Sequence, residues 1–164
     1  MKRLILVRHA KSDWADAGLS DHERPLNSRG KKDAPRMAKA AAEQTVAPDI
    51  IVSSSAKRAI TTAKAFAKEF NYSENNIDVR DDVYSADWRS CLNIINSIND
   101  SDCRVAMLVG HNPFITELAD RLTRQSFGNV PTCGVIMIDF DVASWAEVST
   151  GLGKISFYEY PKNM

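Results

Sequence analysis

The sequence predicts an α/β fold, a three-layer sandwich with helices on both faces of a mostly parallel central sheet. Three short runs, at residues 4–7, 50–52 and 104–109, are apolar apart from Arg104 and have the length and composition of strands buried on both faces. Each run is followed by apolar residues at helical spacing, and such alternation favours parallel strands joined by right-handed crossovers. The 164 residues have room for one domain, spanning 1–164, with a substantial core.

The helices of this pattern begin at residues that favour helix starts. The first is expected to begin at Ser28, after a long polar loop, and to turn several alanines toward the core. The serines at 53–55 are candidate N-caps of the second helix. A third helical pattern spans 88–98, and a fourth helix is expected with Asn112 as its N-cap and Pro113 as its first residue.

The remaining segments predict further strands. Residues 77–79 are expected to form a short edge strand, followed by a loop over 80–84. Runs at 135–140, 145–149 and 155–160 are rich in β-branched and aromatic residues and are separated by turn residues. We therefore expect three more strands in the last third of the chain.

Cationic residues stand where the predicted strands end. Arg8 and His9 close the first strand, Arg58 lies in the first turn after the second, and His111 follows the third. Because the carboxyl ends of parallel strands lie along one edge of a sheet, these side chains are expected to converge in one crevice. Guanidinium groups offer donor forks to phosphate oxygens, and a neutral imidazole can act as a nucleophile. The sequence therefore predicts a pocket for a dianion, most simply a phosphoryl group.

Charge and residue composition limit the kinds of binding partner that the sequence favours. The formal net charge is zero, which gives no electrostatic argument for nucleic acid or an anionic membrane as partner, and no apolar run has the length of a membrane span or signal peptide. We expect no metal site, because the three histidines have unrelated spacings. The cysteines lack metal or redox spacing, so we expect a cytoplasmic protein in which Cys91, Cys103 and Cys133 are reduced core or near-core residues. We also expect a monomer.

The prediction of a phosphoryl-binding pocket is strengthened by four sequence motifs that follow one another along the chain. They are Leu-Val-Arg8-His9-Ala-Lys-Ser, Arg24-Pro-Leu-Asn-Ser-Arg-Gly, Ser-Ser-Ser-Ala-Lys-Arg58-Ala-Ile-Thr-Thr-Ala and Val-Gly-His111-Asn-Pro. Together they resemble the histidine phosphatase (phosphoglycerate mutase-like) superfamily and its small SixA-like members, the phosphohistidine phosphatases. The resemblance implies that His9 is the phosphoryl-accepting nucleophile, that Arg8 and Arg58 bind the phosphate, and that His111 completes the pocket. Arg24 matches an arginine that also reaches the phosphate in the SixA-like branch. The implied enzyme needs no metal or cofactor and acts on a phosphorylated protein or a small phosphorylated substrate.

Two positions depart from the family pattern. Ala10 stands where many members have glycine after the nucleophile. No glutamate stands where the general acid is usual, and Asp81 or Asp82 is the carboxylate nearest to that place. A proton donor matters most for a basic alkoxide leaving group. Phosphohistidine releases imidazole, a better leaving group, so a weak or missing acid favours phosphohistidine as the substrate.

Other functions are open to the same residues. The run before Asp139 imitates the nucleophile strand of a haloacid-dehalogenase-type phosphatase, but too little chain follows it to complete such an enzyme. A mutase would use the same pocket with inserted segments that this chain lacks. A phosphatase of small phosphomonoesters remains an alternative, as does a non-catalytic phospho-binding module, which would hold phosphate and release no product.

Overall fold

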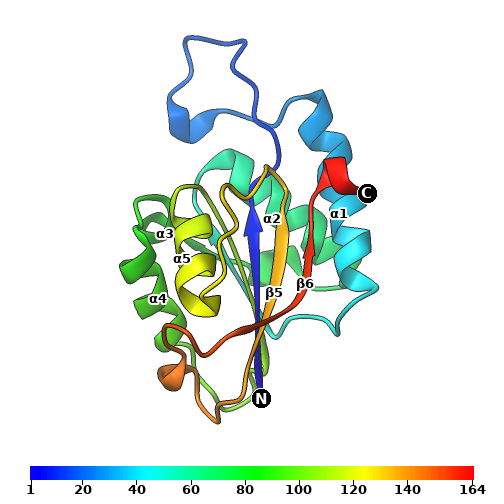
Figure 1. The fold of residues 1–164 in the computed structure, drawn as a ribbon. Helices are drawn as coiled ribbons and strands as arrows, with labels where there is room; N and C mark the ends of the chain where they lie inside the picture. Colours follow the sequence, from blue (N-terminus) through cyan, green and yellow to red (C-terminus); the bar gives the residue numbers. More distant parts are fainter.

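The computed structural model describes residues 1–164, which form one six-stranded sheet with helices on both sides (Figure 1). The strands are β1 Lys2–Arg8, β2 Ile50–Ser54, β3 Asp78–Arg80, β4 Val105–Gly110, β5 Val135–Phe140 and β6 Lys154–Glu159. The helices are α1 Ser28–Ala42, α2 Lys57–Glu69, α3 Asp81–Tyr84, α4 Trp88–Asn96 and α5 Phe114–Thr123. No helix combines the length and the apolar composition that crossing a bilayer requires.

The sheet has the order β3-β2-β4-β1-β5-β6, with β3 at one edge as the sequence predicts. Neighbours among β1 to β4 pair in parallel, whereas β5 pairs antiparallel with both β1 and β6. The mostly parallel sheet is therefore confirmed. Its central strand β1 is buried on both faces from Leu4 to Val7, which explains why its apolar run does not alternate.

Two core clusters fill the two faces of the sheet. Ile5 and Val7 point into the cluster that includes Met37 of α1 and Phe66 of α2. The alternate residues of β1 point into the cluster under α4 and α5, which also contains the buried Trp145. The three-layer prediction is confirmed. So is the burial of the free cysteines, which are Cys91, Cys103 and Cys133.

Two predicted elements are wrong. Residues 80–84 include the short helix α3 instead of forming a loop, and Val83 anchors that helix in the core. Residues 145–149 form no strand, because Trp145–Glu147 is a 3₁₀ helix. The Trp145 backbone N–H donates to Asp100 Oδ1, and its indole N–H donates to the Cys103 carbonyl. These bonds hold the buried Trp145 side chain in the core, and they outweigh the strand propensity of an aromatic residue.

The predicted helix caps also differ from the structure. The N-cap of α2 is Ala56, which has no capping side chain, and none of the three serines at 53–55 caps the helix. The N-cap of α5 is Pro113, one residue later than predicted. Asn112 still satisfies the helix start, because its Oδ1 accepts from the backbone N–H and the hydroxyl of Thr116. By contrast, Asn27 caps α1 by accepting from the N–H of Gly30.

Candidate active site

Strand register places two histidines side by side. In the parallel pair of β1 and β4, Arg8 is the partner of Gly110, so His9 and His111 are each the next residue at the carboxyl edge of the sheet. Their ring centroids are 5.1 Å apart. Both side chains are buried. The long loop that follows β1 projects from the top of the molecule in Figure 1. The predicted convergence of these two residues is therefore confirmed.

The His9 ring is held in one tautomer. Its Nδ1 lies 2.7 Å from the carbonyl oxygen of Ala10, which can only accept, so Nδ1 carries the hydrogen. The backbone N–H of His9 donates to Gly110, and its carbonyl accepts from Cys133. The two backbone bonds hold the main chain of His9, and the Nδ1 bond orients the ring and leaves Nε2 unprotonated, which is the condition for nucleophilic attack by a neutral imidazole.

His111 is oriented by the second strand. Its Nε2 lies 2.6 Å from Ser54 Oγ, and the same oxygen accepts from the N–H of Ala56. The Ser54 hydroxyl forms no hydrogen bond in which it donates to another acceptor, so it donates to Nε2, and the hydrogen of the neutral His111 ring is on Nδ1. That Nδ1 is buried and has no hydrogen-bond partner. It is a donor available to a bound anion.

Arg8 and Arg58 each present a donor that is buried and unpaired. Arg8 Nη1 donates to the carbonyl of Val130, while its Nε has no partner. Arg58 donates from Nη1 to the carbonyl oxygen of Asp21 and from Nη2 to the Asp21 carboxylate, while its Nε has no partner. With His111 Nδ1, these are the only buried side-chain nitrogens of the chain without a hydrogen bond. Leaving a buried donor unpaired costs about 1–3 kcal/mol, which a ligand that accepts from it would recover.

Burial keeps both histidines neutral. Desolvation is the main cause that lowers the pKa of His9 to about 3; the positive charges of Arg58 and Arg8 act in the same direction, and the bond to Ala10 opposes them. Desolvation and the charge of Arg58 lower the pKa of His111 to about 4. At neutral pH the positive charge of the site therefore comes from its guanidinium groups.

Arg24 lies in the site through the loop after β1. It is buried, and its Nη1 donates to Ser12 Oγ at 2.7 Å while its Nη2 donates to Asp21 Oδ1 at 2.9 Å. Its guanidinium carbon lies 3.4 Å from the ring centroid of Trp14, a side chain that is 70% exposed. Arg24 therefore shares Asp21 with Arg58 and has fewer free donors than that residue.

Asp21 joins the arginines but has no place in the sequence prediction. Its Oδ2 accepts from Arg58 Nη2 at 3.0 Å and from the hydroxyl of Tyr84 at 2.7 Å, and its Oδ1 accepts from Arg24. The Tyr84 hydroxyl and the two guanidinium groups hold the pKa of Asp21 well below its usual range. The one signal in the sequence is position, because Asp21 is three residues before Arg24 in a polar loop.

The sequence prediction also assigns no role in the site to Tyr84 or His22. The Tyr84 ring meets the His111 ring edge to face at 5.6 Å, and the His22 ring meets Tyr84 in the same manner at 4.7 Å. His22 Nε2 lies 2.8 Å from Ser55 Oγ. The serines predicted as caps of α2 thus contact histidines instead: Ser54 orients His111, and Ser55 holds His22.

Asp81 and Asp82 lie on α3 beside the site. The Asp82 carboxylate is exposed and forms an ion pair with Arg80 at 2.7 Å, a pairing that also lowers its pKa. Asp81 is three residues before Tyr84 in the same helix, and residues at this spacing share a helix face. Of the two aspartates, Asp81 is therefore the one that shares a helix face with Tyr84.

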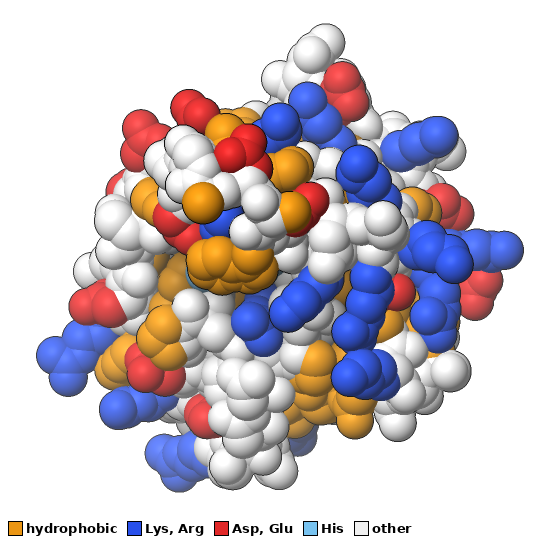
Figure 2. Space-filling model, turned by 90° about the horizontal axis from the view of Figure 1, so that it is seen from above, with side chains coloured by type: hydrophobic (Ala, Val, Ile, Leu, Met, Phe, Trp, Pro, Cys, Tyr) orange, Lys and Arg blue, Asp and Glu red, His pale blue; other side chains and the backbone are white.

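The surface around the site is cationic. Figure 2 looks onto the carboxyl edge of the strands and shows Lys and Arg side chains gathered across that face. Exposed members follow β1 or lie in the first turns of α1 and α2, and they are Lys11, Arg29 and Lys57. This surface attracts an anionic substrate before it reaches the buried donors.

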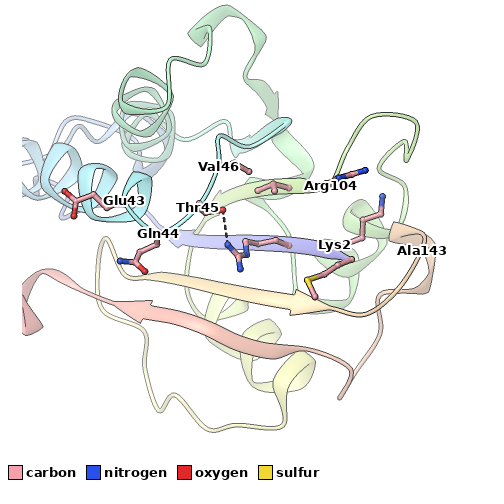
Figure 3. A pocket seen from close by; sticks show the side chains of 10 residues that line it. Lys2, Glu43, Gln44, Thr45, Val46, Arg104 and Ala143 are labelled. Atoms are coloured by element: carbon pink, nitrogen blue, oxygen red, sulfur yellow. Dashed lines mark hydrogen bonds between the residues drawn. The ribbon is translucent and has the colours of Figure 1, made fainter.

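A separate hollow lies at the amino ends of β1 and β4 (Figure 3). It has a volume of about 730 Å³, and its lining includes Lys2, Arg3 and Arg104. Arg3 is already paired with Asp139 at 2.6 Å, and Lys2 donates to the carbonyl of Cys103. Asp139 thus forms an ion pair at the edge opposite His9, unlike a phosphatase nucleophile. Size alone does not mark this hollow as the reaction site, since it holds no unpaired buried donor.

Comparison with known proteins identifies the family. Residues 4–89 match the model of the histidine phosphatase superfamily (branch 1). An uncharacterized chloroplastic protein of Arabidopsis thaliana is 33% identical over 153 residues, which is 89% of this chain and 70% of that protein. The matched segment contains His9 and three arginines of the site, which are Arg8, Arg24 and Arg58.

Solved structures share the whole fold. A structure from Agrobacterium tumefaciens assigned as the phosphohistidine phosphatase SixA is 28% identical, with a TM-score of 0.80 and 98% of each chain covered. The protein histidine phosphatase SixA in complex with tungstate has a TM-score of 0.82 at 18% identity, again over 98% of each chain. The chain belongs to the histidine phosphatase superfamily, branch 1, and is a SixA-like phosphohydrolase.

Proposed function

We propose that the protein removes the phosphoryl group from phosphohistidine on a protein, through a phosphohistidine intermediate at His9. The observation that supports this most directly is the set of unpaired buried donors on Arg8, Arg58 and His111. They come from three neighbouring segments and stand around a neutral imidazole with a free Nε2. A phosphoryl group would accept from all three donors while facing that nitrogen.

The reaction has two steps. His9 Nε2 attacks phosphorus, so a P–N bond to His9 forms as the P–N bond of the substrate breaks, and the departing imidazole takes a proton from solvent. Negative charge on the equatorial oxygens is stabilised by the guanidinium groups of Arg8 and Arg58 and by the N–H of His111. Water then attacks the phosphorylated His9, which releases phosphate and restores the neutral ring. The arginine charges supply the stabilisation that a metal ion gives in other phosphatases.

The choice of phosphohistidine rests on the leaving group. Imidazole departs without strong help from an acid, and the carboxylate closest to the arginines, Asp21, has a pKa held too low for efficient proton donation. SixA proteins described as phosphohistidine phosphatases share the fold over nearly the full length. The exposed cationic surface also suits approach by a phosphorylated protein.

Small phosphomonoesters are the second candidate substrates. The observation in their favour is Asp81, which shares a face of α3 with Tyr84 and could donate a proton to an alkoxide. A binding module without turnover is the third possibility, and it differs from both by releasing no phosphate.

Phosphate release distinguishes the three. The substrates are a phosphohistidine protein, free phosphohistidine and a panel of phosphomonoesters, each with wild type and His9→Ala in EDTA. We expect fast release from the phosphohistidine protein that requires His9 and survives EDTA. Preference for a monoester would favour the second candidate, and the absence of release from every substrate would favour the binding module.

A further inference from the structure

The Asp21 carboxylate sits against the charged side chains that would hold the phosphoryl group. It receives one guanidinium bond from Arg58 at 3.0 Å and one from Arg24 at 2.9 Å, and its own backbone carbonyl receives a second bond from Arg58 at 2.7 Å. Both arginines are buried, whereas the Asp21 side chain is 50% exposed. The negative charge therefore stands on the solvent side of the guanidinium groups.

These bonds leave the substrate side of Arg58 open. Asp21 occupies the two Nη atoms, and the Nε that remains is the buried, unpaired donor. A phosphoryl group bound to Nε would thus share Arg58 with Asp21 and need not displace it. The carboxylate acts on the anion through charge and does not block the pocket.

The charges of the site balance a dianion. Three guanidinium groups, on Arg8, Arg24 and Arg58, are opposed by the one carboxylate of Asp21, while both histidines are neutral at pH 7. The result is two net positive charges, which match the two negative charges of a phosphoryl dianion. Without Asp21 the pocket would hold three positive charges and would bind the same anion more tightly.

We infer that Asp21 is a charge-balancing residue that weakens the hold of the pocket on inorganic phosphate and so promotes product release. This inference rests on the proposed function for the identity of the bound anion. It assigns Asp21 a role in turnover that differs from proton donation, because the residue acts through the arginines. Excess positive charge would stabilise the product as well as the transition state, and binding both equally adds nothing to turnover at saturating substrate.

Calorimetric binding of orthophosphate and of tungstate tests the inference without any need for turnover. Asp21→Asn keeps the shape of the side chain and removes its charge. We expect both anions to bind about fivefold more tightly at low ionic strength, as Coulomb attraction near a partly exposed site allows. Steady-state kinetics should show KM and kcat falling together, and added phosphate should inhibit the variant more strongly than wild type.

The matched control is Asp16→Asn. Asp16 belongs to the same loop, and its carboxylate bonds only to the N–H of Gly18, so this variant removes an equal charge that is not paired with the arginines. Its anion affinity should stay that of wild type. Thermal unfolding checks the fold of each variant, and Asp21→Ala provides a second measurement of the same sign if the amide is poorly tolerated.

Equal or weaker anion binding by folded Asp21→Asn would overturn the inference, since Asp21 would then serve as an anchor for Arg24 and Arg58. A loss of kcat confined to monoesters, with unchanged phosphate affinity, would also overturn it and identify a proton donor. Failure of wild type to bind either anion would instead contradict the proposed function. The two failures are therefore distinguishable.

Discussion

His9 and His111 lie with their ring centroids 5.1 Å apart because each follows one member of the register pair Arg8 and Gly110. The two rings have different chemical roles. In each ring, the role of the free nitrogen is set by the hydrogen bond that the second nitrogen forms. A carbonyl oxygen fixes the hydrogen of His9 on Nδ1, and a serine hydroxyl leaves the hydrogen of His111 on Nδ1 as a free donor. Backbone register thus pairs a nucleophile with a donor.

The buried histidines make the stability of the protein depend on pH. The folded protein lowers the pKa of His9 to about 3 and that of His111 to about 4, from the ordinary 6.5. Below pH 6.5 the unfolded chain binds protons that the folded chain does not, so the free energy of unfolding decreases as the pH is lowered. The fall from pH 7 to pH 5 should be about 2 kcal/mol for each histidine. Urea unfolding of wild type and His9→Asn at both pH values measures it, and equal falls in the two proteins would refute the assignment.

Arg58 and Arg24 should contribute unequally. Arg58 has an unpaired buried Nε, whereas the Nε of Arg24 already contacts Asp21 at 3.3 Å. A lysine cannot reproduce the donor fork, so we expect Arg58→Lys to lower kcat/KM on the order of 100-fold and Arg24→Lys about tenfold. Steady-state kinetics with one substrate gives both values. A larger loss for Arg24→Lys would mean that Arg24 is the principal phosphate ligand.

The two aspartates of α3 make a matched pair. For a phosphomonoester with a basic leaving group, we expect Asp81→Asn to lower kcat about tenfold, since Asp81 shares the face of Tyr84. Asp82→Asn should leave kcat unchanged, because the Asp82 carboxylate is bound to Arg80 on the surface. With a phosphohistidine substrate neither variant should matter. An effect of Asp82→Asn alone would reverse the assignment.

Close packing at Gly30 ties α1 to the segment after the nucleophile. A Cβ at this position would overlap the carbonyl oxygen of Lys11 and lie 3.0 Å from its nitrogen. Because backbone atoms must move to make room, Gly30→Ala should cost about 2 kcal/mol of stability and lower kcat/KM. Gly18→Ala is the control, since its Cβ would meet only the Asp16 side chain. Thermal unfolding and activity of both variants test this, and two equal results would disprove the packing argument.

The sequence was sufficient to predict the four parallel strands and the four residues at their carboxyl edge. Arg8 and His111 could be placed because each follows an apolar run that has only one plausible structure, a buried strand. Asp21 and Tyr84 could not, because their positions depend on the path of a long loop and on the anchoring of α3 by Val83. Both are contacts between segments far apart in the sequence, which no local pattern encodes.

Two of the wrong predictions, at Ser54 and Trp145, have a common cause, which is competition for a polar partner. Ser54 is a good N-cap by propensity, yet in the fold its hydroxyl contacts His111. Trp145 favours a strand by propensity, but its backbone and indole N–H groups bond to Asp100 and Cys103. Tertiary partners decide such positions, and a single sequence does not reveal them.

The most direct test of the central claim is to trap the phosphorylated enzyme. Wild type is mixed with substrate, quenched rapidly under alkaline conditions that preserve phosphohistidine, digested and mapped by mass spectrometry. The structure predicts one phosphoryl group, on Nε2 of His9, and none in His9→Ala. A phosphoryl group on another residue, or turnover by His9→Ala at the wild-type rate, would contradict the account.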